Sequence, residues 1–301
     1  MVVRWRVLDF SSFEGELRSI RGGIEVVRKD APDVSIPIAD VALVLVGRGV
    51  HFGTAVLHRL CSADVAVLFC DWRGVPEGGA YSWSEHGRVA ARHRAQASLS
   101  EPRRKNAWGR IVHAKIMGQA AVLKASDVEG GGELISLASE VRSGDPGNIE
   151  AQAARRYWRA YLGREQGRFP GSGELLGWNS CLDYGYSVLR GFVIRSLLAA
   201  GLCGSLGVFH KGRGNVFALA DDLIEPVRPC IDSAVRELSR DASPSDPEVK
   251  RLLVAAATRR FTPEGLTVQA VLDDFAQQFG MYVEGDVRRL SPPVWQGPQG
   301  D

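Results

Sequence analysis

The stretch NAWGRIVHAKIMGQAAVLKA, residues 106–125, decides the fold of the larger part of this 301-residue chain. Its apolar residues recur at Ile111, Val112, Ile116, Ala120 and Leu123. This spacing follows the 3.6-residue period of one helix face, so it predicts an amphipathic helix. The later stretches share the pattern, and we expect the chain to be helical from about residue 86 onward.

The first seventy-odd residues have a different pattern. Short β-branched segments such as GELRSI (15–20) and VALVLV (41–46) are separated by Gly, Asp or Pro, which predicts strands. One interruption has Val56, Leu57 and Leu60 at helical spacing, so we expect a short helix there. The predicted fold class is therefore α+β, with a small N-terminal β-sheet domain followed by a larger all-α C-terminal domain.

Composition shifts suggest where these domains begin and end. Glycine and proline gather in residues 71–82, and the tail SPPVWQGPQGD is also rich in both. The predicted boundaries are a β domain at 1–78, a linker at 79–90, a helical domain at 91–285 and a flexible tail at 286–301.

Bulk properties exclude several classes of protein. The net charge is +2, and the five cysteines form no C-x-x-C pair, which favours a reduced, intracellular protein. The start of the chain lacks the apolar core of a signal peptide, and no apolar run is long enough to span a bilayer. We expect a cytoplasmic protein with no membrane association. Phosphate-binding glycine motifs are missing too, so we expect no nucleotide cofactor.

A lone histidine lies in the glycine-rich stretch LGVFHKGRGN, residues 206–215. If residues 219–225 are helical, Asp222 and Glu225 share a face, close in sequence to His210. An imidazole with carboxylates suits Mg²⁺ or Mn²⁺, and Glu150, in the first turn of a predicted helix, is the candidate third ligand. Each residue also has a structural explanation. Glu150 interacts with the helix dipole, His210 is solvated or hydrogen-bonded, and the acids form the solvent-exposed face of a helix.

Basic residues cluster in three places. Residues 86–125 hold nine Lys or Arg against one acid, a second group is interleaved with aromatic residues, and two cations follow His210 directly. The candidate DNA-binding residues are Arg103, Arg104, Lys105, Arg155, Arg156, Arg159, Lys211 and Arg213. Such clusters suit a phosphate backbone and splayed bases, although a solvated face or ion pairing with another segment would explain them too. From the residues alone, we predict a metal-dependent nuclease or phosphoryl transferase that acts on nucleic acid.

Four runs in order resemble a known family: NIEAQAARRYW, LDYGYSVLRGFVIRSLLAAGL, LGVFHKGRGN and FALADDLIEPVRP. The family is the CRISPR-associated integrase/endonuclease of spacer acquisition, the larger of the two near-universal adaptation proteins. The resemblance implies that Glu150, His210 and Glu225 are catalytic metal ligands for Mg²⁺ or Mn²⁺. Asp222 would lie behind these ligands or hold a second metal.

The resemblance also implies partners and a reaction. The protein would form a homodimer through its β domains and a heterohexamer with a small ferredoxin-like adaptation partner, in a prokaryotic cytoplasm. Its helical domain would bind a short spacer-precursor duplex and insert it into the CRISPR repeat array, by direct attack of a DNA 3′-OH. Two alternatives stay open: a branched-DNA or repair nuclease that uses the same metal site, and a non-catalytic DNA-binding scaffold.

Overall fold

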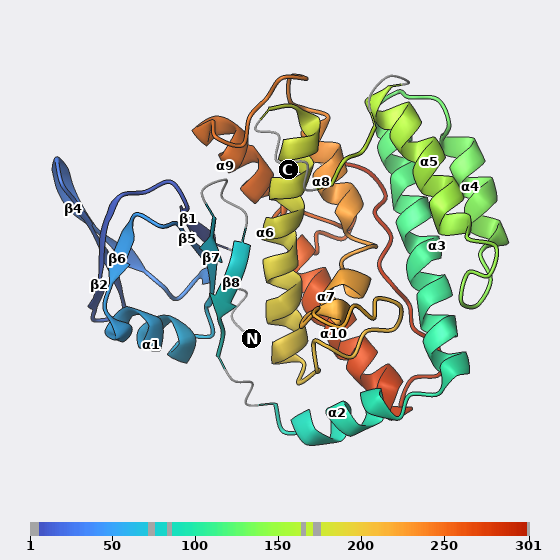
Figure 1. Cartoon of the computed structure of the whole chain (residues 1–301), viewed down its shortest axis with the longest axis horizontal. Helices are drawn as coiled ribbons and strands as arrows, with labels where there is room; N and C mark the ends of the chain where they lie inside the picture. The colour runs from blue at the N-terminus through green and yellow to red at the C-terminus, as the bar shows by residue number, and fades with distance from the viewer. Residues whose placement is uncertain (1–5, 72–75, 83–85, 164–166, 171–175, 300–301) are drawn as a thin grey trace. The chain divides into compact units, whose positions relative to one another are not determined.

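The computed structural model of the chain describes residues 6–71, 76–82, 86–163, 167–170 and 176–299 (Figure 1). The chain divides into two compact units, Met1–Trp83 and Ser84–Asp301. The strands and one short helix lie in the first unit, and the remaining helices lie in the second, which confirms the predicted α+β class. Among the described residues, no helix combines the length and apolar character needed to cross a membrane.

The N-terminal unit contains two four-stranded sheets, in the orders β1-β5-β7-β8 and β4-β3-β2-β6. In the first sheet β1, β5 and β7 run parallel and β8 is antiparallel to β7. In the second, β2, β3 and β4 are antiparallel neighbours and β6 joins β2 in parallel. Its elements are β1 Arg6–Phe10, β2 Gly15–Ile20, β3 Gly23–Arg28, β4 Ala31–Pro37, β5 Val41–Val46, β6 Val50–Phe52, α1 Thr54–Ser62, β7 Ala66–Cys70 and β8 Pro76–Ala80.

Apolar burial explains why these segments form sheets. All six residues of β5 are buried, as expected for a continuous apolar run in a parallel sheet. The α1 helix contributes Val56 and Leu60 to the same apolar core, which confirms the predicted short helix. The connection between β2 and β3 is only two residues long. Such a tight turn needs a residue with positive φ, and Gly22 adopts a φ of 76° there because glycine has no Cβ atom.

The helical unit is built around two long helices, α3 and α6. The α3 helix packs on α4, α5 and α8, whereas α6 packs on α8, α9 and α10. The elements are α2 Val89–Ala97, α3 Glu101–Ala125, α4 Gly131–Glu140, α5 Ile149–Leu162, α6 Trp178–Ala199, α7 Ala218–Leu223, α8 Arg228–Val235, α9 Pro247–Ala256 and α10 Val268–Glu284.

Two glycines let the short helix α8 pack closely against both long helices. A Cβ atom at Gly118 of α3 would lie 2.8 Å from Pro229, and one at Gly185 of α6 would lie 2.5 Å from Ile231. Both distances are shorter than van der Waals contact, so any other residue would push α8 away. This packing fixes the segment that joins α7 to α8, where Glu225 lies.

The structure differs from the sequence-based boundaries at two places. Pro76–Ala80 forms strand β8, although its glycine and proline content predicts a loop that ends the domain. The segment after α10 is not a loose tail, because Leu290 and Trp295 are buried and Trp295 packs on Phe261 at a ring-centroid distance of 5.3 Å. Two large apolar side chains anchor it despite the surrounding Pro and Gly. Residues 83–85 of the expected linker and residues 300–301 lie outside the described residues.

Candidate active site

Glu150 is placed by the start of α5. The Asp145 carboxylate accepts hydrogen bonds from the backbone N–H groups of Ile149 at 2.8 Å and Glu150 at 2.9 Å. It therefore satisfies the free donors of the first helical turn, as a capping residue does. Asp145 and Asn148 both have positive φ, 47° and 49°, so the loop before α5 is tightly bent. The result is a fixed direction for the Glu150 side chain.

The Glu150 and Glu225 carboxylates converge on one ammonium group. Lys115 of α3 places its Nζ atom 2.7 Å from Glu150 Oε1 and 2.7 Å from Glu225 Oε2. Arg228 lies 3.3 Å from the other oxygen of Glu225. Glu225 is 4% exposed, and its Oε2 atom has no well-aligned hydrogen bond among the described residues. A buried carboxylate oxygen that is paired with an ammonium in this way is also a suitable ligand for a metal cation.

Charge pairing outweighs burial in this cluster. Burial by itself would raise the pKa of Glu225, but Arg228 and Lys115 hold that pKa below its ordinary value. Burial would lower the pKa of Lys115, yet the carboxylates of Glu225 and Glu150 raise it. The Glu225 carboxylate and the Lys115 ammonium are therefore both charged near neutral pH.

His210 is held by Asp222, which is fully buried. One Asp222 oxygen accepts from the backbone N–H of Val208 at 2.6 Å and of Phe209 at 3.3 Å. The other lies 3.1 Å from the His210 backbone nitrogen and 2.8 Å from its ring atom Nδ1. The hydrogen bond to Asp222 raises the pKa of His210 above its ordinary value, although partial burial opposes it. Both oxygens of Asp222 thus hold the backbone and ring of residues 208–210. Among the described residues no hydrogen bond engages the ring atom Nε2, so this atom can serve as a ligand.

The loop that follows His210 is anchored at both ends by adjacent acids. Asp222 holds residues 208–210, while Asp221 accepts from Asn215 Nδ2 at 2.6 Å and from Arg190 Nε at 2.6 Å. A Cβ atom at Gly207 would lie 2.6 Å from the carbonyl oxygen of His210 and 2.8 Å from Asp222 Oδ2, so only glycine fits there. Residues 211–214 between the anchors are all exposed.

The three predicted ligands lie in one region. Glu150 and Glu225 share the Lys115 ammonium, and His210 and Glu225 are close enough to shift each other's pKa. In the part of the chain that the structure describes, no three His, Cys, Asp or Glu side chains are already grouped as a metal site. The donor set nonetheless fits a divalent ion, because two carboxylates surround a cation and a third donor, Nε2, is available. The Lys115 ammonium lies where the negative charge of the Glu150 and Glu225 carboxylates is concentrated.

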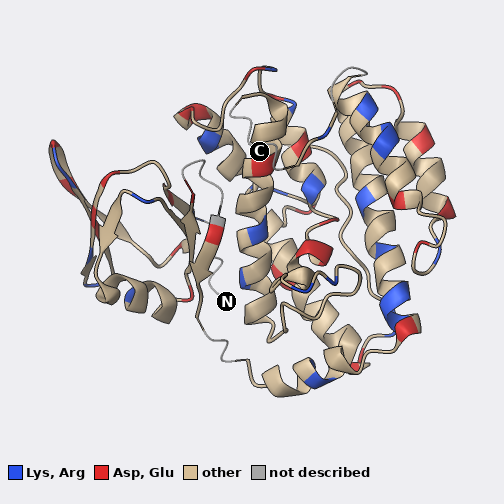
Figure 2. Cartoon of the chain, in the orientation of Figure 1, with Lys and Arg blue, Asp and Glu red and all other residues tan. Residues whose placement is uncertain are grey.

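The predicted DNA-binding residues have different surroundings. Figure 2 shows Lys and Arg along α3 and α5. Lys211 and Arg213 are exposed in the loop beside His210, and Arg155, Arg156 and Arg159 are exposed on α5. Of the α3 group, Lys105 is exposed and pairs with Glu101 at 2.8 Å, and the half-buried Arg104 donates to the Leu99 carbonyl at 3.3 Å.

Arg103 has a structural role instead. Its guanidinium donates to the backbone carbonyls of Tyr282 and Val287 and lies 4.3 Å from the centre of the Tyr282 ring. These contacts fasten the start of α3 to the end of α10. The Arg103 guanidinium is therefore engaged within the protein, and it is not proposed as a DNA-binding group.

Sequence reasoning missed Lys115 and Asp145. Lys115 was only one of nine basic residues, although it lies four residues after Ile111 and three after Val112, both buried. A lysine within the apolar stripe of a helix signals a buried partner, and that signal could have found it. Asp145 gave no comparable signal, because a carboxylate that caps from outside the helix resembles any loop acid.

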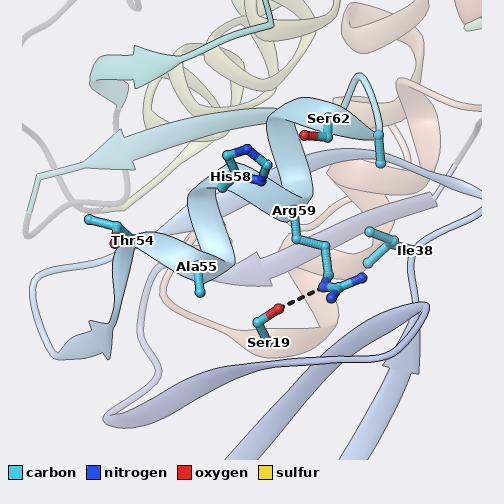
Figure 3. A pocket seen from close by; sticks show the side chains of 8 residues that line it. Ser19, Ile38, Thr54, Ala55, His58, Arg59 and Ser62 are labelled. Carbon is cyan, nitrogen blue, oxygen red and sulfur yellow. Dashed lines mark hydrogen bonds between the residues drawn. The ribbon is translucent and has the colours of Figure 1, made fainter.

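The N-terminal unit has an open hollow beside α1, with a volume of about 810 Å³ (Figure 3). Its lining includes Ser19, Thr54, His58 and Arg59, and Arg59 Nε donates to Ser19 Oγ at 2.6 Å. None of the described residues that line it is acidic. This hollow therefore lacks the carboxylates that a magnesium or manganese site requires.

Residues 11–246 match the family model described as CRISPR associated protein Cas1. The match spans more than half of the chain, and this chain belongs to that family. One relative is the CRISPR-associated endonuclease Cas1 of Neisseria meningitidis serogroup C (strain 8013), which is 35% identical over 215 residues. That alignment covers 71% of this chain and 69% of the relative.

Solved structures share the fold at low sequence identity. A casposase bound to an integration product is 16% identical with a TM-score of 0.79, and the match covers 99% of this chain and 95% of that one. A Cas1 protein from Thermotoga maritima is 18% identical with a TM-score of 0.75, covering 93% and 97%. A Cas6-RT-Cas1–Cas2 complex also contains a similar chain, at 17% identity and a TM-score of 0.70, covering 97% of this chain and 36% of that one.

Proposed function

We propose that this protein is a divalent-metal-dependent DNA integrase that inserts short foreign DNA into a CRISPR array by 3′-OH transesterification. The observation that carries the proposal is the convergence of Glu150 and Glu225 on one cation, beside a histidine whose Nδ1 is held by a buried aspartate. Membership of the Cas1 family and the similarity to a casposase bound to an integration product support it.

The residues divide into ligands, positioning groups and phosphate-binding groups. Glu150, Glu225 and Nε2 of His210 would hold Mg²⁺ or Mn²⁺, which supplies a Lewis acid that polarises a phosphoryl oxygen and lowers the pKa of the attacking hydroxyl. Asp222 fixes the imidazole orientation through Nδ1. The exposed cations Lys211 and Arg213 neutralise the phosphate that reacts.

Further cations extend the DNA path. Arg155, Arg156 and Arg159 are exposed on α5, the helix whose first turn carries Glu150. Arg104 and Lys105 lie near the start of α3, where the hydrogen bond from Lys105 and, to a smaller extent, the charge of Lys211 lower the pKa of the Glu101 carboxyl. We propose that these residues bind the backbone of the spacer-precursor duplex or of the repeat array.

The partners follow from the same proposal. A homodimer formed through the N-terminal units would combine with a small ferredoxin-like partner in a heterohexamer and act in a prokaryotic cytoplasm. The similarity to the chain in a complex of Cas1 with Cas2 supports an assembly of this kind.

A strand-transfer assay tests the proposal. The protein and its small partner are mixed with a labelled short duplex and a plasmid that carries the repeat array, with Mg²⁺ or Mn²⁺. We expect labelled DNA joined at the repeat boundary, and loss of joining with a chelator or with Glu150→Gln, His210→Ala or Glu225→Gln. The matched control is Glu248→Gln, which removes an exposed glutamate of α9 and is expected to keep full activity.

The name endonuclease carried by the relatives favours a second candidate, a nuclease for branched DNA that uses the same residues with water as the nucleophile. Cleavage without joining, indifferent to the repeat sequence, would support that candidate. DNA that is bound but neither cut nor joined under any metal would instead indicate a scaffold.

A further inference from the structure

A half-exposed phenylalanine lies directly beside the candidate active site. Phe209 is 50% exposed, although it precedes His210 in a loop that Asp222 holds firmly. Its ring stacks on the indole of Trp108, with ring centroids 4.1 Å apart and an angle of 1° between the planes. Trp108 is only 2% exposed, so it covers one face of Phe209 from inside the protein. The opposite face is the one available to a ligand.

This ring has a fixed place relative to the predicted metal ligands. The Phe209 and His210 ring centroids are 5.6 Å apart, and His210 also meets Trp108 edge-on at 5.9 Å. The Phe209 backbone N–H donates to Asp222 at 3.3 Å, so both its backbone and its ring are held. A flat apolar surface positioned this firmly suits a flat ligand better than a flexible one.

The positive charge beside Phe209 indicates that the planar ligand carries a phosphate, as a nucleotide does. Lys211 and Arg213, which are exposed, follow within four residues of Phe209, so the loop that carries the planar ring also carries positive charge. Aromatic stacking combined with backbone phosphate contacts is how proteins bind single-stranded nucleic acid. A base inside a duplex has neighbours on both faces, whereas an unpaired base has a free face that can stack on Phe209.

We propose that Phe209, supported by Trp108, stacks on the base of an unpaired nucleotide adjacent to the phosphate that reacts. This inference rests on the proposed function and deepens it, because it assigns a positioning residue for the DNA end. The stack would hold that nucleotide out of the duplex while the exposed cations hold its phosphate.

The test measures binding rather than joining, in the presence of a chelator. The probe is a short duplex with an unpaired end, in which one unpaired base is the fluorescent analogue 2-aminopurine. Stacking is expected to quench the probe when the wild-type protein binds. For Phe209→Leu we expect the Kd to rise about 5- to 150-fold, the range measured for losing one base–aromatic stack. Phe209→Tyr keeps a flat ring and is expected to restore both binding and quenching.

Two controls separate stacking from a general loss of structure. Replacing the stacked base by an abasic site is expected to raise the Kd of the wild type as much as Phe209→Leu does. The same replacement is expected to leave the Kd of Phe209→Leu unchanged. Phe169→Leu removes another exposed phenylalanine, which follows the far end of α5 from Glu150, and is expected to leave the Kd unchanged.

The outcomes distinguish this inference from the proposed function. The stacking role is wrong, and the proposed function stands, if the wild type binds DNA and Phe209→Leu binds it equally well. The same conclusion follows if Phe209→Leu loses affinity, relative to the wild type, to the same extent for abasic and for blunt-ended DNA. If the wild type binds no form of DNA, both are wrong. If Phe209→Leu instead abolishes only the association with a protein partner, the exposed ring is a protein-docking surface.

Discussion

Replacing Lys115 by methionine tests the central charge cluster most directly. The Lys115 ammonium lies 2.7 Å from carboxylate oxygens of both Glu150 and Glu225. The Lys115→Met change keeps an unbranched apolar side chain but removes the charge. Two carboxylates, with side chains 22% and 6% exposed, then lose the cation that they share, while Glu225 keeps its contact with Arg228 at 3.3 Å.

The expected loss of stability follows from breaking a buried ion pair. Removing one partner of such a pair costs about 3–5 kcal/mol. Glu150 retains some solvent contact and Glu225 keeps Arg228, so we expect a loss of about 3 kcal/mol, the lower end of that range. For a unit the size of Ser84–Asp301 this corresponds to a fall in Tm of about 6–12 °C, at about 2–4 °C per kcal/mol.

The loss depends on pH and on metal. Because the pKa of Glu225 is lowered from 4.5, its ion pairing stabilises the fold above pH 4.5 and is lost as the pH falls through the lowered pKa. The deficit of Lys115→Met is therefore largest near neutral pH and shrinks in acid. Saturating Mg²⁺ or Mn²⁺ is expected to raise the Tm of Lys115→Met more than that of the wild type, since no ammonium competes for the two carboxylates.

Thermal unfolding followed by far-ultraviolet circular dichroism measures both effects, with chelator and with metal. Lys105→Met is the matched control on the same helix, because Lys105 pairs with Glu101 at 2.8 Å on the surface, with side chains 57% and 71% exposed. Its expected cost is below about 1 kcal/mol, as for most exposed ion pairs. An unchanged Tm for Lys115→Met in chelator, or an equal gain from metal in both proteins, would refute the reasoning.

Three further predictions concern the groups that surround this cluster. Asp145→Ala removes the cap of α5 and is expected to lower the free energy of unfolding by about 1–2 kcal/mol. It is also expected to reduce the joining of DNA, because the Glu150 side chain is no longer held in place. An unchanged free energy of unfolding in chemical denaturation would contradict this prediction. Asp222→Asn weakens the hydrogen bond and removes the charge that together raise the pKa of His210. A histidine titration by NMR without metal is therefore expected to show that pKa falling from above 6.5 toward its ordinary value, and an unchanged titration would rule out this cause. Asp232 is fully buried with its pKa raised from 3.8 to about 6, so its stabilising protonated state is complete below 3.8 and lost as the pH rises through about 6. The free energies of unfolding of the wild type and Asp232→Asn should therefore diverge by about 3 kcal/mol between acid and neutral pH, and a constant difference would show that the pKa is not raised.

Local patterns were sufficient for most of the fold. The apolar run 41–46 and the helical spacing in 106–125 are decided by burial of their own side chains, so each predicts its element without knowledge of the rest. The segment Pro76–Ala80 could not be predicted, because it becomes a strand only by pairing with β7. The burial of Trp295 likewise depends on Phe261, which lies on a distant part of the chain.

The candidate site divides in the same way. The sequence around His210 and Glu225 predicts an acidic and imidazole cluster. The structure joins Glu150 and Glu225 through Lys115 and His210 to Asp222, while no three His, Cys, Asp or Glu side chains of the described residues are grouped as a metal site. The sequence leaves two roles open for Asp222, metal binding and support of a ligand, and its four contacts to residues 208–210 favour support. Lys115 could not be assigned beforehand, because its two partners lie 35 and 110 residues later in the chain.

Because the neighbouring carboxylates of Asp221 and Asp222 hold both ends of the loop at residues 211–214, this loop can change in length at little cost to stability. They secure Asn215 on one side and His210 on the other, while nothing lies within 4 Å of where a Cβ atom at Gly214 would be. Lengthening residues 211–214 costs little entropy, about 0.6 kcal/mol for each doubling of a flexible loop. Under the proposed function, relatives can therefore evolve new DNA contacts in this loop without displacing the imidazole one peptide bond away.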